Sequence, residues 1–132
     1  MIDLMSAAQE AAFKALAAAI PPELAEVYDH VPQGTEPNFV KLGAIEASNE
    51  GDKDDQRERF ELEVHTIYRG ADRSRLLAIM HQVRLALDDQ PLELEGVDFS
   101  TPSFLSAAAS DPASDGVTYA GITTFEIYAE PA

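Results

Sequence analysis

The sequence predicts an α+β fold, a single domain in which a mixed, mostly antiparallel sheet of about five strands carries two main helices on one face. Three observations lead to this prediction. The length of 132 residues suits one hydrophobic core, so one domain is expected over residues 1–132. Two segments have the apolar spacing of helices, and alternating segments lie between and after them. Most connections are too short for a parallel crossover.

The first expected helix covers residues 5–20. Its apolar side chains recur at spacings of three and four among alanines: Leu4, Phe13, Leu16 and Ile20. The proline pair at 21–22 ends the pattern. The polar face lacks the basic residues that attract a helix to a membrane, so we interpret the apolar stripe as core packing.

A short strand is expected in the run from Val27 to Val31, followed by a turn and a second strand that ends at Gly43. Pro32, Gln33 and Gly34 form the turn, because proline presets one backbone angle and glycine tolerates positive values of φ. A polar loop over residues 47–56 is expected next.

The clearest strand pattern covers residues 57–68. One face is apolar apart from a threonine, with Phe60, Leu62, Val64, Thr66 and Tyr68; the other is mostly charged, with Arg59, Glu61, Glu63, His65, Ile67 and Arg69. This alternation indicates one buried face and one face in contact with water or a neighbour.

The second expected helix covers residues 72–87, where Asp72 is the candidate cap. Its stripe is spaced by four, three and four residues: Leu76, Met80, Val83 and Leu87. A closing strand is expected over residues 116–128. Neither of its faces is strongly charged, which is typical of a central strand or of one covered by another subunit.

The order of these elements, together with the run Tyr28, Asp29, Pro32, Gln33 and Gly34 behind an Ala-rich helix, resembles the tail-completion (tail-terminator) proteins of long-tailed phages and gene transfer agents. The resemblance spans nearly the whole chain and rests on turn and core patterns. Residues 106–115 depart from it, since small residues, Asp and Pro stand where a more charged loop is expected.

The resemblance implies a structural role without catalysis or cofactor. It implies a hexameric ring that caps the tail tube, ends tube polymerisation and presents a face to the head-completion (stopper) protein in the neck. The major tail tube protein, the stopper and further copies of the chain are then its partners, and DNA passes through without specific binding. The expected location is a virion or gene transfer agent particle assembled in the bacterial cytoplasm. A monomer of the isolated chain is compatible with this resemblance.

The net charge of the chain and its distribution agree with a protein that does not bind DNA. The formal net charge is −15, and no Lys or Arg follows Arg84. Nucleic-acid binders need cations to displace counterions from phosphates, so this chain should repel DNA. The absence of cysteine excludes disulfides and thiolate chemistry. No long apolar run or basic leader is present, so we expect a soluble protein without a membrane partner.

Two groups of charged residues are candidate functional sites. The first is an acidic loop, formed by Glu50, Asp52, Asp54 and Asp55. Such a run is either a solvated loop or, if the resemblance holds, the border of a DNA channel, where carboxylates keep a polyanion from sticking. The second group is a set of arginines for pairing with carboxylates of a neighbouring subunit: Arg57, Arg59, Arg69, Arg73, Arg75 and also Arg84.

Two other function classes stay open at this point. Glu61, Glu63 and His65 share one strand face and would suit a divalent metal in an enzyme, although alternating polar residues are also what a solvent-exposed strand face carries. No nucleophile elbow or phosphate-binding glycine loop is present. Alternatively, a small acidic protein can act as a DNA mimic or an adaptor that occupies a basic groove of another protein.

Overall fold

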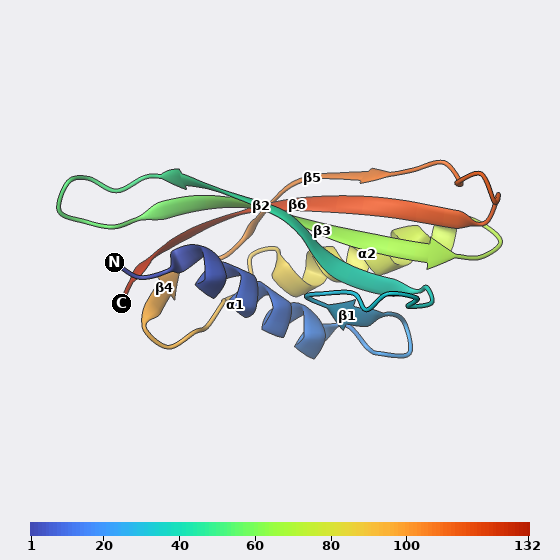
Figure 1. The fold of residues 1–132 in the computed structure, drawn as a ribbon, viewed down its shortest axis with the longest axis horizontal. Coiled ribbons are helices and arrows are strands. Elements are labelled where there is room, and N and C mark those ends of the chain that lie inside the picture. The colour runs from blue at the N-terminus through green and yellow to red at the C-terminus, as the bar shows by residue number, and fades with distance from the viewer.

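The computed structural model describes residues 1–132 as a six-stranded sheet with both helices, α1 (Leu4–Ala19) and α2 (Ser74–Leu87), on the same face (Figure 1). The strands are β1 (Glu26–Tyr28), β2 (Phe39–Asn49), β3 (Glu58–Arg69), β4 (Val97–Phe99), β5 (Ser103–Ala109) and β6 (Thr118–Pro131). The predicted α+β class is therefore confirmed, with one strand more than expected.

The strand order is β1-β2-β3-β6-β4, and β5 also pairs with β6. All pairs are antiparallel except β1 with β2, so the sheet is mixed but mostly antiparallel, as predicted. β6 is central: β3 follows it along one side, while β5 and β4 share the other side in succession. Ser100 bridges the break between β4 and β5: its N–H donates to the Tyr128 carbonyl and its hydroxyl accepts from the Tyr128 N–H, each at 2.9 Å.

The core lies between the sheet and the two helices. α1 contributes mainly small side chains, which let the helix lie close to the strands: Leu4, Ala7, Ala8, Ala11, Ala12 and Leu16. From the sheet, the apolar face predicted for β3 is buried, and Phe125 and Ile127 of β6 are fully buried beside it. The helical stripe predicted for α2 is also buried, and Ile79 extends it.

Aspartates stabilise the starts of both helices. Asp3 accepts hydrogen bonds from the backbone N–H (3.0 Å) and hydroxyl (2.6 Å) of Ser6, which lower the pKa of its carboxyl. Asp72 accepts the corresponding bonds from Ser74, and these likewise lower its pKa. The cap predicted at Asp72 is wrong in position: the N-cap residue of α2 is Arg73, which makes no side-chain capping bond, and Asp72 instead orders the turn just before the helix through Ser74.

Three local expectations need correction. β2 does not end at Gly43: it continues through an irregularity between Leu42 and Ile45 into the first residues of the expected loop, because the long β3 offers a partner there. The segment from Ser106 onward is not all loop, since it completes β5 along the otherwise unpaired side of β6. The turn is present, with φ of +82° at Gly34, but the ten-residue connection lets β1 and β2 run parallel.

Candidate assembly surfaces

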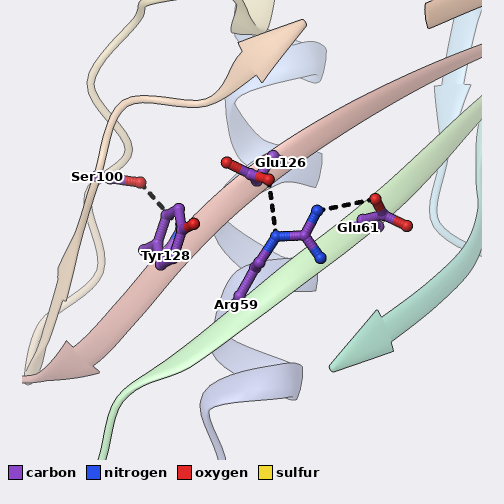
Figure 2. A network of polar contacts seen from close by, with 5 residues as sticks. All are labelled: Arg59, Glu61, Ser100, Glu126 and Tyr128. Atoms are coloured by element: carbon purple, nitrogen blue, oxygen red, sulfur yellow. Dashed lines mark hydrogen bonds and ion pairs between the residues drawn. The ribbon is translucent and has the colours of Figure 1, made fainter. Parts of the chain in front are cut away.

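The sheet face opposite the helices carries a charged network centred on Arg59 (Figure 2). Its guanidinium donates to Glu126 on the neighbouring strand (2.7 Å) and to Glu61 two residues along its own strand (2.9 Å). The three side chains are only 22–38% exposed. The hydrogen bond to Glu126, followed by that to Glu61, raises the pKa of Arg59 further above its ordinary value. Arg59 therefore holds two carboxylates on this face within its own chain.

Glu63 and His65 form a second pair on the same face. The Nε2 atom of His65 lies 2.9 Å from the Glu63 carboxylate, and the ring covers Gly43 of β2. A Cβ at Gly43 would lie 2.4 Å from that nitrogen, so only glycine leaves room for the ring in this position.

The three residues considered for a metal are thus divided between two partners. Glu61 binds Arg59, while Glu63 contacts His65. No group of three or more His, Cys, Asp or Glu side chains is arranged to hold a metal ion. The shared strand face was correctly predicted, but the pairing partners could not be read without the sheet register.

The remaining candidate arginines have different surroundings. Arg57 lies over the Tyr128 ring (5.0 Å) and Arg84 over the Phe104 ring (3.9 Å). Arg69 pairs loosely with Glu36 (3.5 Å) and Arg73 with Asp111 (3.7 Å). Arg75 is exposed and forms no ion pair within its own chain. It is therefore the arginine most available to a neighbouring subunit.

The predicted acidic loop lies at the tip of the β2–β3 hairpin, which projects beyond the helices at one end of the long axis (Figure 1). Glu50, Asp52, Asp54 and Asp55 are all exposed. Asp52 organises the tip by accepting hydrogen bonds from the backbone N–H groups of Asp54 (2.9 Å) and Asp55 (3.0 Å). The other three carboxylates face solvent.

The end of the tip loop that leads into β3 is tied to the segment just before α1. The Gln56 amide donates to the Ile2 carbonyl (2.8 Å) and accepts from the Ile2 N–H (3.1 Å), and it also donates to Glu58 (3.0 Å). Residues 54 positions apart in the sequence therefore hold the hairpin at a defined angle to the helical layer.

The predicted turn motif lies in the connection between β1 and β2, in the other half of the molecule from the acidic tip (Figure 1). Pro32, Gln33 and Gly34 are exposed, and the Pro32 carbonyl accepts bonds from the N–H (3.2 Å) and hydroxyl (2.6 Å) of Thr35. Tyr28 packs edge-on against Phe39, with ring centroids 6.0 Å apart. Asp29 is exposed and the structure gives it no partner.

Two surface features were missed from the sequence. β5 was missed because its run of alanine and serine has low strand propensity. The second feature is the pair of exposed leucines Leu77 and Leu85 on the outer side of α2, which lie about two turns apart with His81 between them. The sequence did contain an indication of this pair, since both leucines lie outside the predicted buried stripe of α2. No helix of the structure is both long and apolar enough to cross a membrane.

Comparisons with known proteins address the family and the fold of this chain. The family model described as "Tail completion protein gp17" matches residues 4–130. A solved chain described as "Virion of native gene transfer agent (GTA) particle" superposes with a TM-score of 0.77. It is 23% identical, and the match covers 92% of this chain and 93% of that chain, so the likeness establishes a shared fold. No curated protein sequence matches this chain.

Proposed function

This chain belongs to the tail completion protein gp17 family, and from that premise we propose that it forms a hexameric ring on the end of a tail tube. The ring ends polymerisation of the tube, presents a face to the stopper protein and leaves a passage for DNA. The observation that carries the proposal is the family match, which includes both helices and all six strands. The particle is a phage virion or a gene transfer agent.

The arrangement of charged side chains supports a binding role rather than chemistry. Arg59 and His65 are each engaged by carboxylates on an open sheet face. Such polar contacts order a surface, whereas a catalytic base or nucleophile needs a partner that activates it toward a substrate in a cleft. We therefore assign no reaction to this protein.

The acidic hairpin tip is proposed to border the DNA channel. Its four carboxylates project from one end of the sheet on a hairpin that is fixed to α1 through Gln56. Negative charge at a channel mouth denies phosphates the cation contacts that would hold the DNA in place. DNA would pass this rim without sticking to it.

Electrostatic repulsion is the main obstacle to the ring. Six copies carry a formal charge of six times −15, or −90. Apolar burial and pairs between arginines and carboxylates of neighbours must offset this repulsion, and Arg75 is the cation best placed to contribute. We predict that rings, measured by native mass spectrometry or light scattering, become more populated as salt rises from low to moderate levels. The reverse trend would contradict this electrostatic account.

The function is tested by deleting the gene and imaging the particles. Tails of unregulated length, or tails that do not join heads, are expected, with complementation by the intact gene as the control. Tails of normal length in particles that lack the protein would overturn the proposal. A monomer in solution would not, because the tail end can act as the template for ring assembly.

A further inference from the structure

The sheet has two open edges, one on each side. β5 pairs only with β6, so its other side has no strand partner. On the far side of the sheet, β1 covers β2 only from Phe39 to Lys41, and the remainder of β2 has no outer partner. Both edges therefore present backbone N–H and C=O groups to solvent, which is the usual template for adding a further strand.

The β5 edge lacks the usual protection of an exposed strand. No charged residue or proline occurs from Ser103 to Ala109, although Lys and Pro commonly block free edges. The Asp88 carboxylate accepts the N–H of Phe104 (3.0 Å), which leaves the backbone from Leu105 to Ala109 uncovered. The adjacent surface is apolar, with Leu105 43% exposed and Ile122 39% exposed.

The open edge of β2 is longer than that of β5 and is similarly low in charge. Residues 42–49 contain one charged side chain, Glu46, and otherwise glycine, alanine, leucine, isoleucine, serine and asparagine. In a chain with a net charge of −15, these two edges are among the few surfaces that another copy can approach without facing many carboxylates.

The strand directions are also compatible. β2, β3, β6 and β5 are antiparallel in succession, so β5 runs opposite to β2. A rotation about an axis close to the strand direction preserves these directions. It therefore places β5 of one copy antiparallel to β2 of the next, the direction of every pairing among these four strands.

We propose that the open edge of β5 pairs with the open edge of β2 in a second copy of this chain, so that the ring closes through one continuous sheet. This inference rests on the proposed ring and names the contact that builds it. The contact is heterologous, because each copy offers two different edges, and contacts of this kind close into a ring when the rotation from copy to copy completes a full turn.

The geometry gives this ring a defined inside. The helices cover one sheet face, so the open face with the Arg59 network lines the lumen and the helices lie outside. Four strands from each of six copies, about 4.8 Å apart and tilted by about 40°, give a barrel roughly 50 Å across at the backbone. The acidic hairpin tips then lie together at one rim.

Engineered cysteines test the contact, since the chain has none of its own. Ala108→Cys on the open face of β5 is combined in turn with Ala44→Cys, Glu46→Cys or Ser48→Cys, which sample different registers. A disulfide requires Cα atoms within about 7 Å. We expect at least one combination to give a ladder of covalent oligomers in purified particles after mild oxidation. Ala108→Cys combined with Ala17→Cys, on the exposed side of α1, is the matched control and should give no ladder.

A second test blocks the edge without altering the fold. The N–H groups of successive residues in a strand point alternately to its two sides. Ser110 donates its N–H to β6, so the N–H of Ala107, three residues earlier, points to the open side of β5. Ala107→Pro removes this outward donor. The amount of this variant protein incorporated into particles should fall about tenfold or more, whereas Ala107→Ser should assemble normally. Circular dichroism and the melting temperature establish whether the variant is folded.

The outcomes separate this inference from the proposed function. If no cysteine combination cross-links in particles that contain the protein, or if folded Ala107→Pro assembles normally, the edge contact is wrong and the role in tail completion is untouched. If cross-linked rings form but deletion leaves tails normal, the contact stands and the proposed function fails.

Discussion

The replacement Phe125→Ala tests where the core lies relative to the sheet. Phe125 is fully buried on the helix side of β6, and its ring packs edge-on against Phe104 of β5, with centroids 6.3 Å apart. The replacement leaves a cavity and removes an aromatic pair. Losses of this kind cost about 3–5 kcal/mol of unfolding free energy.

This cost translates into a large thermal shift. At about 2.1 cal/mol/K per residue, 132 residues have an unfolding entropy of roughly 0.28 kcal/mol/K, so a loss of about 4 kcal/mol lowers Tm by about 14 °C. Urea unfolding followed by circular dichroism measures the free energy, and calorimetry measures Tm. Ile122→Ala is the matched control, because Ile122 lies on the opposite face of the same strand and is 39% exposed. It should cost less than about 1 kcal/mol.

A double-mutant cycle extends the test to β5. Phe104 lies between Phe125 and the guanidinium of Arg84, so we expect the replacements Phe104→Ala and Phe125→Ala to be coupled by about 0.5–1.5 kcal/mol. If Phe125→Ala cost no more than Ile122→Ala, the assignment of the helix side as the buried face would be wrong. Additive effects of the two phenylalanine replacements would show that the ring contact does not anchor β5.

Three further predictions concern the hairpin and the turn before β6. Gly51→Ala should destabilise the fold by roughly 1–3 kcal/mol in urea unfolding, because its Cβ would lie 2.0 Å from the Asp55 carbonyl oxygen; unchanged stability would refute this close approach. Gln56→Ala should speed amide hydrogen exchange in residues 50–57 by mass spectrometry with little change in global stability, and exchange as slow as in the wild type would contradict the tie to Ile2. Bonds from Thr118 and Val117 lower the pKa of Asp115, so the stability that its charge contributes is present above the unfolded pKa of about 3.9 and is lost as pH falls through the lower folded value. The stability difference between wild type and Asp115→Asn should therefore shrink toward zero in acid, and a difference that persisted unchanged at about pH 2 would count against this linkage.

The charge distribution could be predicted in part. The sequence shows the acidic run and the lack of bases after Arg84. It does not show that the acidic run lies at the far tip of a projecting hairpin. The Arg59 network was also hidden, because Glu126 lies 67 positions away and becomes a partner only through the register of β3 with β6.

The elements with strong periodicity could be predicted from the sequence alone. The alternation of β3 and the stripe of α2 indicate burial on one face locally, and the structure places those faces in the core. The family was also predicted correctly from the order of the elements and the turn at Gly34, and the family match confirms it.

The arrangement of strands at the two edges of the sheet depends on contacts between distant segments and could not be predicted from the sequence. The small residues of β5 carry no periodic hydrophobic signal, and they form a strand because β6 has backbone groups to pair. The parallel pairing of β1 and the extension of β2 beyond Gly43 have the same origin. Backbone hydrogen bonding between distant segments depends on which neighbour is available, and a local pattern of side chains does not encode that choice.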